Sequence, residues 1–449
     1  MGRHRGNWAV PAAALALTAI VIAGCSSSSS SSTTTTSTTA ASTATTKGST
    51  SSAAPGVTAT QINVGAISTK TGPIAGYFAG LSPGVTAYFD ALNAQGGING
   101  RRLVLAYDLD DGGSPSQFTQ LTHTVIDQDQ AFAVVVGSPW FNPAYFVSTN
   151  TPTYGYNVTS NWAGPGNLFA AGGSTQIYSS AVPTYAYFAK ATGSKSLAFI
   201  SYGPGVAASY GACSTAASDL KAAGYNVSFV DVGAQLGGSY ASDVQRMQQA
   251  GSDMVLSCMQ ASDDITLARD IQQYGLKVKQ LWLNGYDQNL LNQYSSLMQG
   301  VYMNNSGNVP FEAGKPAKFG NLYPGMQQYL ADMAKYEPSD ALNNVSFAGW
   351  QSAALLAAGI KAAGSNLTQA NVINQTNKIV GFTADGTSST VDWTTAHTTN
   401  TLPNCTAFIQ AKGSTFVSVF GSGKQVFVCL GASVKDPVPV AAPAGTPGA

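Results

Sequence analysis

The feature that most constrains the fold is an alternation of short apolar strands with helices that begin at recognisable capping residues. The segment FAVVV at 132–136 is apolar on both faces, as a strand buried inside a parallel sheet requires. Strands at 62–67 and 102–107 precede it, and Ser82-Pro83 and Ser114-Pro115 are predicted to cap and begin the intervening helices. This βαβαβ order predicts a doubly wound parallel sheet, whose ligand loops lie beyond the carboxyl ends of the strands.

The same alternation starts again after the glycine-rich segment 168–176. The second half is predicted to contain strands at 196–201, 226–232, 253–259 and 280–283 and helices near 207–223, 241–250 and 263–274. The chain becomes helical from about residue 318, and we expect those helices to return to the first lobe. The predicted fold class is therefore α/β, with two doubly wound parallel-sheet lobes.

The low content of charged residues indicates which kinds of partner the protein can bind. Charged side chains make up only 9% of the 449 residues, and 21 basic residues balance 21 acidic ones. A protein that follows the phosphates of a nucleic acid needs a basic surface, so no nucleic-acid partner is expected. The 20 tyrosines and 48 glycines instead suit contact with small ligands that are polar or apolar.

The N-terminus has the pattern of a secreted lipoprotein. Arg3 and Arg5 precede an uncharged, mostly apolar run over 8–23 that is typical of a signal peptide and too short for a membrane span. The run ends at Ile22-Ala23-Gly24-Cys25, which resembles a bacterial lipobox. This resemblance implies cleavage before Cys25 and a lipid on its thiol that anchors the protein to the membrane. An ordinary signal peptide followed by a chance cysteine is the alternative.

A low-complexity segment follows Cys25. Residues 26–54 are Ser, Thr, Ala and Gly with one charged residue, Lys47, so they bury too little apolar surface to fold. We expect a flexible tether that holds a folded, soluble body off the membrane. The expected organisation is a signal peptide over 1–24, a tether over 25–56, a first lobe over 57–172 and 306–400, a second lobe over 173–305 and 401–434, and a Pro/Ala-rich tail over 435–449.

Four of the five cysteines remain once Cys25 is assigned to the lipid, and an even number in an oxidising compartment predicts two disulfides. Cys405 and Cys429 flank a stretch that alternates apolar and polar residues around two glycine turns. The ends of such a strand meander can meet, so these two cysteines are expected to pair. Cys213 and Cys258 are then expected to form the other disulfide. Four free, buried thiols are the alternative.

Three motifs near the start of the first lobe follow one another in a specific order: TGPIAGY at 71–77, NAQGGINGRRL at 93–103 and YDLDD at 107–111. Together with SYG at 209–211 and GFTADG at 381–386, they resemble a type I periplasmic binding protein over most of 57–430. The group that they resemble is the branched-chain amino acid (leucine/isoleucine/valine) binding proteins of ABC transporters. The resemblance implies two lobes joined by a hinge of three crossing segments, with a ligand cleft between them.

The resemblance also implies partners and a location. We expect a monomer on the outer face of the bacterial cell membrane, held there by its lipid. It would capture a small, polar, amino-acid-like solute and deliver it to an ABC permease. The same fold used as a ligand sensor that acts on a signalling partner is the alternative.

Loops that follow the strands supply the expected pocket residues. They are Tyr77, Trp140, Phe141, Asn142, Tyr156, Val158 and Thr159 in the first lobe, and Tyr202, Gln260, Tyr286 and Asp287 in the second. The resemblance implies that Thr159 holds the ligand carboxylate and Asp287 its ammonium group. The serine that the family has after the third strand is replaced by Phe141 or Asn142, so an amide or an aromatic acid is an alternative ligand. Packing at the lobe interface is the alternative role of Trp140 and Phe141.

No set of catalytic or metal-binding residues is recognisable. His4 belongs to the signal peptide, His123 lies outside the apolar stripe of its helix, and His397 has no Cys, Asp or Glu at metal-ligand spacing. GSGK at 421–424 lacks the first glycine of a P-loop, and DLDDGG at 108–113 lacks the glutamate that closes a calcium loop. We therefore expect a binding protein that uses no cofactor or metal, rather than an enzyme.

Overall fold

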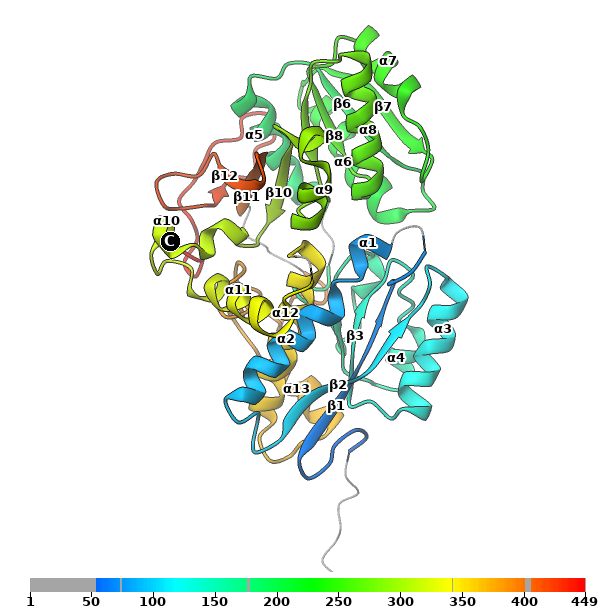
Figure 1. Cartoon of the computed structure of the whole chain (residues 1–449), viewed down its shortest axis with the longest axis vertical. Coiled ribbons are helices and arrows are strands. Elements are labelled where there is room, and N and C mark those ends of the chain that lie inside the picture. Colours follow the sequence, from blue (N-terminus) through cyan, green and yellow to red (C-terminus); the bar gives the residue numbers. More distant parts are fainter. Residues whose placement is uncertain (1–53, 73–74, 176–177, 341, 400–404, 449) are drawn as a thin grey trace, which may run out of the picture. The chain divides into compact units, whose positions relative to one another are not determined.

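The computed structural model describes residues 54–72, 75–175, 178–340, 342–399 and 405–448. The predicted signal peptide, Cys25 and most of the predicted tether lie outside the described residues. The described chain contains two α/β lobes, each built on one sheet with helices on both faces (Figure 1). This arrangement confirms the predicted fold class.

The first sheet is entirely parallel, with the strand order β2-β1-β3-β4-β5. Its strands are β1 (Gln61–Ser68), β2 (Arg102–Asp110), β3 (Ala133–Gly137), β4 (Thr153–Gly155) and β5 (Leu168–Ala170). The predictions of β1, β2 and β3 are confirmed. Strands β4 and β5 were missed because three residues are too few to show a period.

Helices cover both faces of the first sheet (Figure 1). They are α1 (Ala75–Phe78), α2 (Leu81–Ala94), α3 (Pro115–His123), α4 (Ala144–Ser148), α11 (Pro324–Tyr336), α12 (Asn344–Ala363) and α13 (Gln369–Thr376), with short turns η1 (Thr124–Gln128) and η2 (Ser160–Trp162). Val134 and Val136 of β3 pack with Phe118 of α3, whereas Ala133 and Val135 pack in the cluster that contains α2 and α12. Burial on both sides explains why β3 is apolar throughout.

The two helix starts predicted from Ser-Pro pairs have different outcomes. Ser114 caps α3, because its side chain accepts a hydrogen bond from the backbone nitrogen of Gln117. Helix α2 already begins at Leu81, so the prediction that Ser82 caps it is wrong. The Ser82 hydroxyl instead donates to Asp108 of β2, with Oγ and Oδ1 2.5 Å apart, and so ties the helix to the sheet.

The second sheet has the strand order β12-β11-β10-β9-β8-β6-β7, and β13 pairs with β11. Its parallel strands are β6 (Leu197–Tyr202), β7 (Val227–Ala234), β8 (Met254–Ser257), β9 (Lys279–Trp282) and β10 (Tyr302–Ser306), and the antiparallel ones are β11 (Cys405–Lys412), β12 (Thr415–Val419) and β13 (Val428–Cys429). The four predicted strands and the meander are confirmed. Strand β10 was missed because its sequence, YMNNS, is half polar.

Helices also cover both faces of the second sheet. They are α5 (Val182–Thr192), α6 (Ala207–Ala222), α7 (Ala241–Gln249), α8 (Ala261–Tyr274) and α9 (Gln288–Met298), with the short η3 (Ser179–Ala181), η4 (Phe311–Gly314) and α10 (Pro316–Phe319). Leu197 and Phe199 of β6 pack with α5 and α6, and Ala198 and Ile200 pack with α7 and α8. The three predicted helices correspond to α6, α7 and α8.

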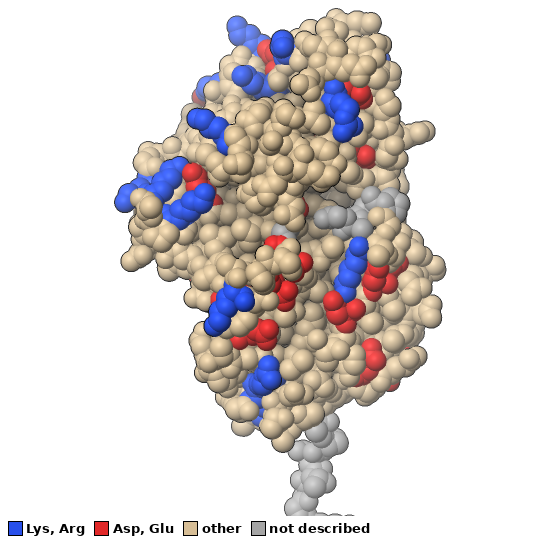
Figure 2. All heavy atoms as spheres, in the orientation of Figure 1, with Lys and Arg blue, Asp and Glu red and all other residues tan. Residues whose placement is uncertain are grey.

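Cross-links and the C-terminal segment complete the second lobe. The predicted disulfides Cys213–Cys258 and Cys405–Cys429 are both present. The segment after residue 434 lies on the folded body, where Asp436 pairs with Lys190 at 2.6 Å. Figure 2 shows charged side chains in small, separate groups on a mostly uncharged face. Within the described ranges, no helix is long and apolar enough to cross a membrane.

Candidate functional site

The strand order of each sheet predicts where a ligand would bind, at the edge formed by the carboxyl ends of the parallel strands. In the first, β2 and β3 flank β1, and in the second, β7 and β8 flank β6, so each parallel order reverses beside its first strand. Ligands of open α/β sheets bind at such switch points, beyond the carboxyl ends of the strands. The predicted pocket residues follow β1, β3 and β4 in the first lobe and β6, β8 and β9 in the second.

Two tyrosines form the polar centre of the first-lobe group. The hydroxyls of Tyr77 in α1 and Tyr156 after β4 are 3.0 Å apart, so one donates to the other. Burial, together with the neighbouring Tyr156, raises the pKa of Tyr77 well above its usual range, and the negative charge of Asp287 raises it further. Both phenols are therefore neutral hydrogen-bonding groups at any ordinary pH.

Asp287 connects the second lobe to helix α12. Its Oδ1 accepts from the backbone nitrogen of Leu290 at 2.9 Å, which caps α9. Its Oδ2 accepts from the side-chain nitrogen of Asn343 at 3.0 Å. Asn343 in turn caps α12, because its Oδ1 accepts from the backbone nitrogens of Val345 and Ser346. One carboxylate thus fastens the starts of two helices.

The loops after β6 and β8 are joined by a second buried network. Tyr202 donates its hydroxyl hydrogen to Asp263 at 2.5 Å, and its oxygen accepts from the backbone nitrogen of Gln260 at 3.1 Å. Burial raises the pKa of Tyr202. The Asp263 carboxylate also accepts from the backbone nitrogen of Gly237 at 3.0 Å. This bond connects the loop after β7 to the same network. Gln260 is therefore held at the start of α8.

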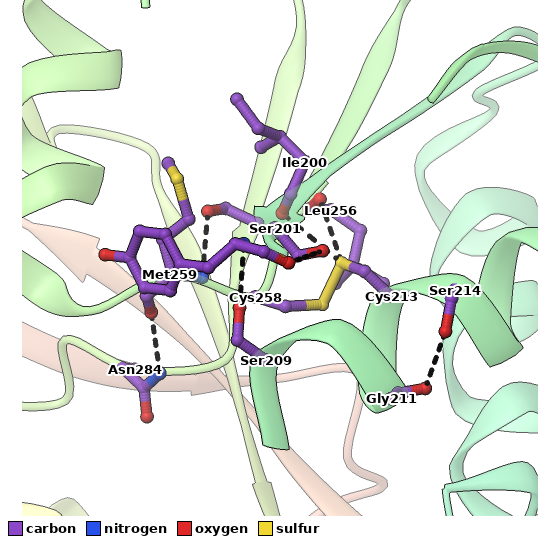
Figure 3. Close-up of a disulfide and its surroundings, with 12 residues drawn as sticks. Ile200, Ser201, Ser209, Gly211, Cys213, Ser214, Leu256, Cys258, Met259 and Asn284 are labelled. Carbon is purple, nitrogen blue, oxygen red and sulfur yellow. Dashed lines mark hydrogen bonds between the residues drawn. A yellow bond between two sulfur atoms is a disulfide. The ribbon is translucent and has the colours of Figure 1, made fainter. Parts of the chain in front are cut away.

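A disulfide joins helix α6 to the loop after β8 (Figure 3). Cys258 follows the last residue of β8, and it is bonded to Cys213 of α6. The carbonyl of Met259, the next residue, accepts a hydrogen bond of 2.7 Å from the side chain of Asn284 after β9. The three loops that carry the predicted second-lobe residues are thus joined to one another.

Two further first-lobe residues carry buried polar atoms that find no hydrogen-bond partner within the described ranges. These atoms are the Thr159 hydroxyl oxygen and the Trp140 indole nitrogen. Their loops follow the neighbouring parallel strands β4 and β3, so they leave the sheet at the same edge. Val158, beside Thr159, packs against a large hydrophobic cluster that contains residues of both lobes.

The structure places three predicted pocket residues elsewhere. Phe141 is only 1% exposed and stacks on Trp162, with the ring centroids 4.2 Å apart, which supports its alternative packing role but in the core beneath α3 and α4. Tyr286 is also 1% exposed and stacks on Phe311 at 4.4 Å. Asn142 is exposed and lines a cavity of about 250 Å³ on the surface between α3 and α4.

Two residues that organise the site were missing from the prediction. Asn343 carries a readable signal, because Asn at 343 and Ser at 346 precede an apolar helix and form a capping box. Asp263 carries none, since its role depends on a tyrosine 61 residues away in sequence. No group of three or more metal-ligating side chains occurs among the described residues.

Comparisons with known proteins agree with this geometry. A family model described as periplasmic binding protein matches residues 61–415. No curated protein matches. Among solved structures, a fatty acid ABC transporter substrate-binding protein from Thermomonospora curvata is similar, with a TM-score of 0.67 and 18% identity over 83% of this chain and 94% of that one.

Two further solved structures share the fold. A branched-chain amino acid ABC transporter protein from Thermus thermophilus with bound valine has a TM-score of 0.64 and 18% identity, over 81% of this chain and 97% of that one. A leucine binding protein from Thermotoga maritima has a TM-score of 0.63 and 14% identity, over 80% and 97%. The family match covers most of the chain, and the two-lobed fold is the one these proteins share. The chain therefore belongs to the periplasmic binding protein family, whose members are solute-binding proteins and not enzymes.

Proposed function

We propose that the protein captures a small polar solute between its two lobes and delivers it to an ABC permease. The solute is amino-acid-like in size and has an apolar part. The observation that carries this proposal is the pair of buried hydroxyls of Tyr77 and Tyr156, 3.0 Å apart, on segments that follow the carboxyl ends of β1 and β4. Tyr77, Tyr156, Thr159 and Gln260 are the proposed solute contacts, because they offer polar groups beside apolar surface.

A binding measurement tests this proposal. The folded domain, residues 52–449, is screened by thermal shift against branched-chain and aromatic amino acids, their carboxylate and amide analogues, urea and sugars. A compound present at a free concentration of 100 times its Kd stabilises the folded protein by about 2.7 kcal/mol, and a thermal shift readily detects a change of this size. Calorimetry of the positive compound should give one site per chain, and Thr159→Ala should weaken it. A folded protein that binds no compound in any class contradicts the proposal.

The N-terminal sequence supports a lipoprotein form of this function. We propose that Cys25 is acylated and that residues 26–54 tether the binding domain to the outer face of the cell membrane. The full-length protein expressed in bacteria should partition into the detergent phase, and Cys25→Ser should release it and abolish incorporation of labelled fatty acid. Unchanged partitioning of Cys25→Ser contradicts the anchor while leaving solute binding untouched.

A further inference from the structure

The carboxylate predicted to receive an ammonium group is nearly buried, and both of its oxygens make structural contacts. Asp287 is only 9% exposed, and both of its oxygens accept hydrogen bonds, one from Leu290 and the other from Asn343. An ammonium group on a solute would have to reach a side chain that is almost wholly buried and share oxygens that already hold the starts of two helices. Any movement of Asp287 towards such a group would loosen the cap of α9 or the connection to α12.

Two other second-lobe acidic side chains near the site are also buried. Asp263 is 3% exposed, and its Oδ2 accepts from Tyr202 and from Gly237. Asp264 is fully buried, and its Oδ1 accepts from the Ser257 hydroxyl. Burial raises the pKa of Asp264 well above its usual range. Both side chains are therefore almost closed to a solute by their burial.

The acidic run at the end of β2 is occupied in the same way. Asp110 accepts from the backbone nitrogens of Lys70, Thr71 and Gly112, and Asp111 is fully buried and accepts from Ser138. Asp108 pairs with the ammonium group of Lys70 and accepts from Ser82. All 21 acidic residues lie in the described ranges, so the undescribed segments supply no further acidic side chain.

Hydrogen-bond donors, by contrast, are available at the first-lobe edge. The buried Thr159 hydroxyl and Trp140 indole N–H have no partner among the described residues. In the Tyr77–Tyr156 pair, one hydroxyl hydrogen bridges the two oxygens, and the other can be donated to a solute or to the neighbouring Asn344 side chain. Neutral donors of this kind suit a carboxylate or an amide oxygen.

From these contacts we infer that the solute presents a carboxylate or a primary amide to the first lobe and carries no ammonium group. This inference rests on the proposed solute-binding function and narrows its ligand to des-amino acids and amides of amino-acid size. Asp287 is then a structural residue, which caps α9 and holds α12, and it does not contact the solute.

Matched compounds test the inference directly. Residues 52–449 are titrated calorimetrically with leucine, 4-methylpentanoate and 4-methylpentanamide, and with phenylalanine, 3-phenylpropanoate and 3-phenylpropanamide. We expect a compound without the ammonium group to bind at least ten-fold more tightly than its parent amino acid. An amino acid that binds as tightly as its analogues, or more tightly, overturns the inference but leaves solute binding in place.

Variants at Asp287 provide the second arm. Asp287→Asn removes the charge but retains a side chain that caps helices well. The exchange Asp287→Asn with Asn343→Asp restores a donor and an acceptor between these positions, so it keeps the protein folded if the single variant does not fold. We expect the affinity for the des-amino compound to stay within three-fold in both, and a loss of ten-fold or more in both overturns the inference.

Two further outcomes of the binding experiments distinguish a failure of this inference from a failure of the proposed solute-binding function. If the folded protein binds another class in the broad screen, such as a sugar, but none of the six compounds, the inference is wrong and the solute-binding function stands. If it binds no compound of any class, the proposed function itself fails.

Discussion

At the scale of single residues, the candidate site contains buried hydroxyl groups that can be removed one at a time by substitution. Tyr77 and Tyr156 each satisfy the other, at 3.0 Å, and no ordinary pH ionises either phenol. A buried polar group that loses its partner costs about 1–3 kcal/mol, whereas removing both partners costs much less. The pair therefore links local stability to the edge where the solute is proposed to bind.

The hydrogen bond between the Tyr77 and Tyr156 hydroxyls gives a prediction for the free energy of unfolding. Tyr77→Phe and Tyr156→Phe should each destabilise the protein by about 1–2 kcal/mol, because each leaves one hydroxyl unpaired. The double variant should lose less than the sum, with a coupling of about 0.5–3 kcal/mol in a denaturant-unfolding cycle. Strictly additive losses would show that the two hydroxyls do not depend on each other.

His397 gives a pH-dependent prediction. It is 9% exposed, its Nε2 contacts Asn377 Oδ1 at 2.5 Å, and burial lowers its pKa below the usual value of about 6.5. Because the unfolded chain binds this proton more readily, its contribution to stability is complete above about pH 6.5 and declines as the pH falls below that value.

The measurement compares variants rather than absolute curves. The difference in unfolding free energy between wild type and His397→Gln should shrink from pH 7.5 to pH 5, by at most about 1.4 kcal/mol per pH unit. His123→Gln is the comparison variant, since the side chain of His123 is 49% exposed on the surface. Equal pH dependence in both differences would contradict the assigned role of His397.

At the scale of elements, the two disulfides have different tasks. Cys405 and Cys429 already lie opposite each other in the β11–β13 ladder, so backbone hydrogen bonds support the same pairing. Cys213–Cys258 joins a helix to the loop after β8, immediately before the residues that contact Tyr202 and Asn284. The second cross-link therefore positions a loop of the site.

Removing each disulfide separately tests this difference. The pairs Cys213→Ser with Cys258→Ser and Cys405→Ser with Cys429→Ser should each cost about 3–4 kcal/mol in the chain-entropy model. Only the first pair should speed amide exchange over residues 258–264 and weaken solute binding. Equal effects of both pairs on exchange and binding would mean that Cys213–Cys258 supports only overall stability.

The elements also show how far the sequence could be interpreted. Strands β1, β3 and β6 were predictable because both of their faces are buried, and the disulfide pairing followed from the meander. The start of α2 was not predictable, because the Ser82 side chain donates its hydrogen bond to Asp108 of β2 and does not cap the helix. Asp287 was identified as a site residue from the resemblance, but only its contacts with Leu290 and Asn343 show that the fold uses both of its oxygens. Phe141 was assigned to the pocket, yet packing against Trp162 places it in the core.

At the scale of the whole molecule, the lobes share contacts on one side. Tyr286 after β9 stacks on Phe311, and the rings of Phe311 and Tyr329 of α11 stack at 5.8 Å. Asp287, which follows Tyr286 in sequence, adds a hydrogen bond to Asn343. A solute that contacts residues of both lobes favours the conformation in which those residues approach each other.

Small-angle X-ray scattering of residues 52–449, with and without the compound that binds most tightly, tests the central claim of a two-lobed solute-binding protein most directly. Saturation is verified by calorimetry in the same buffer. We predict a smaller radius of gyration in the bound form, because binding favours closure of the lobes around the solute. Scattering curves that superimpose at proven saturation would contradict this account.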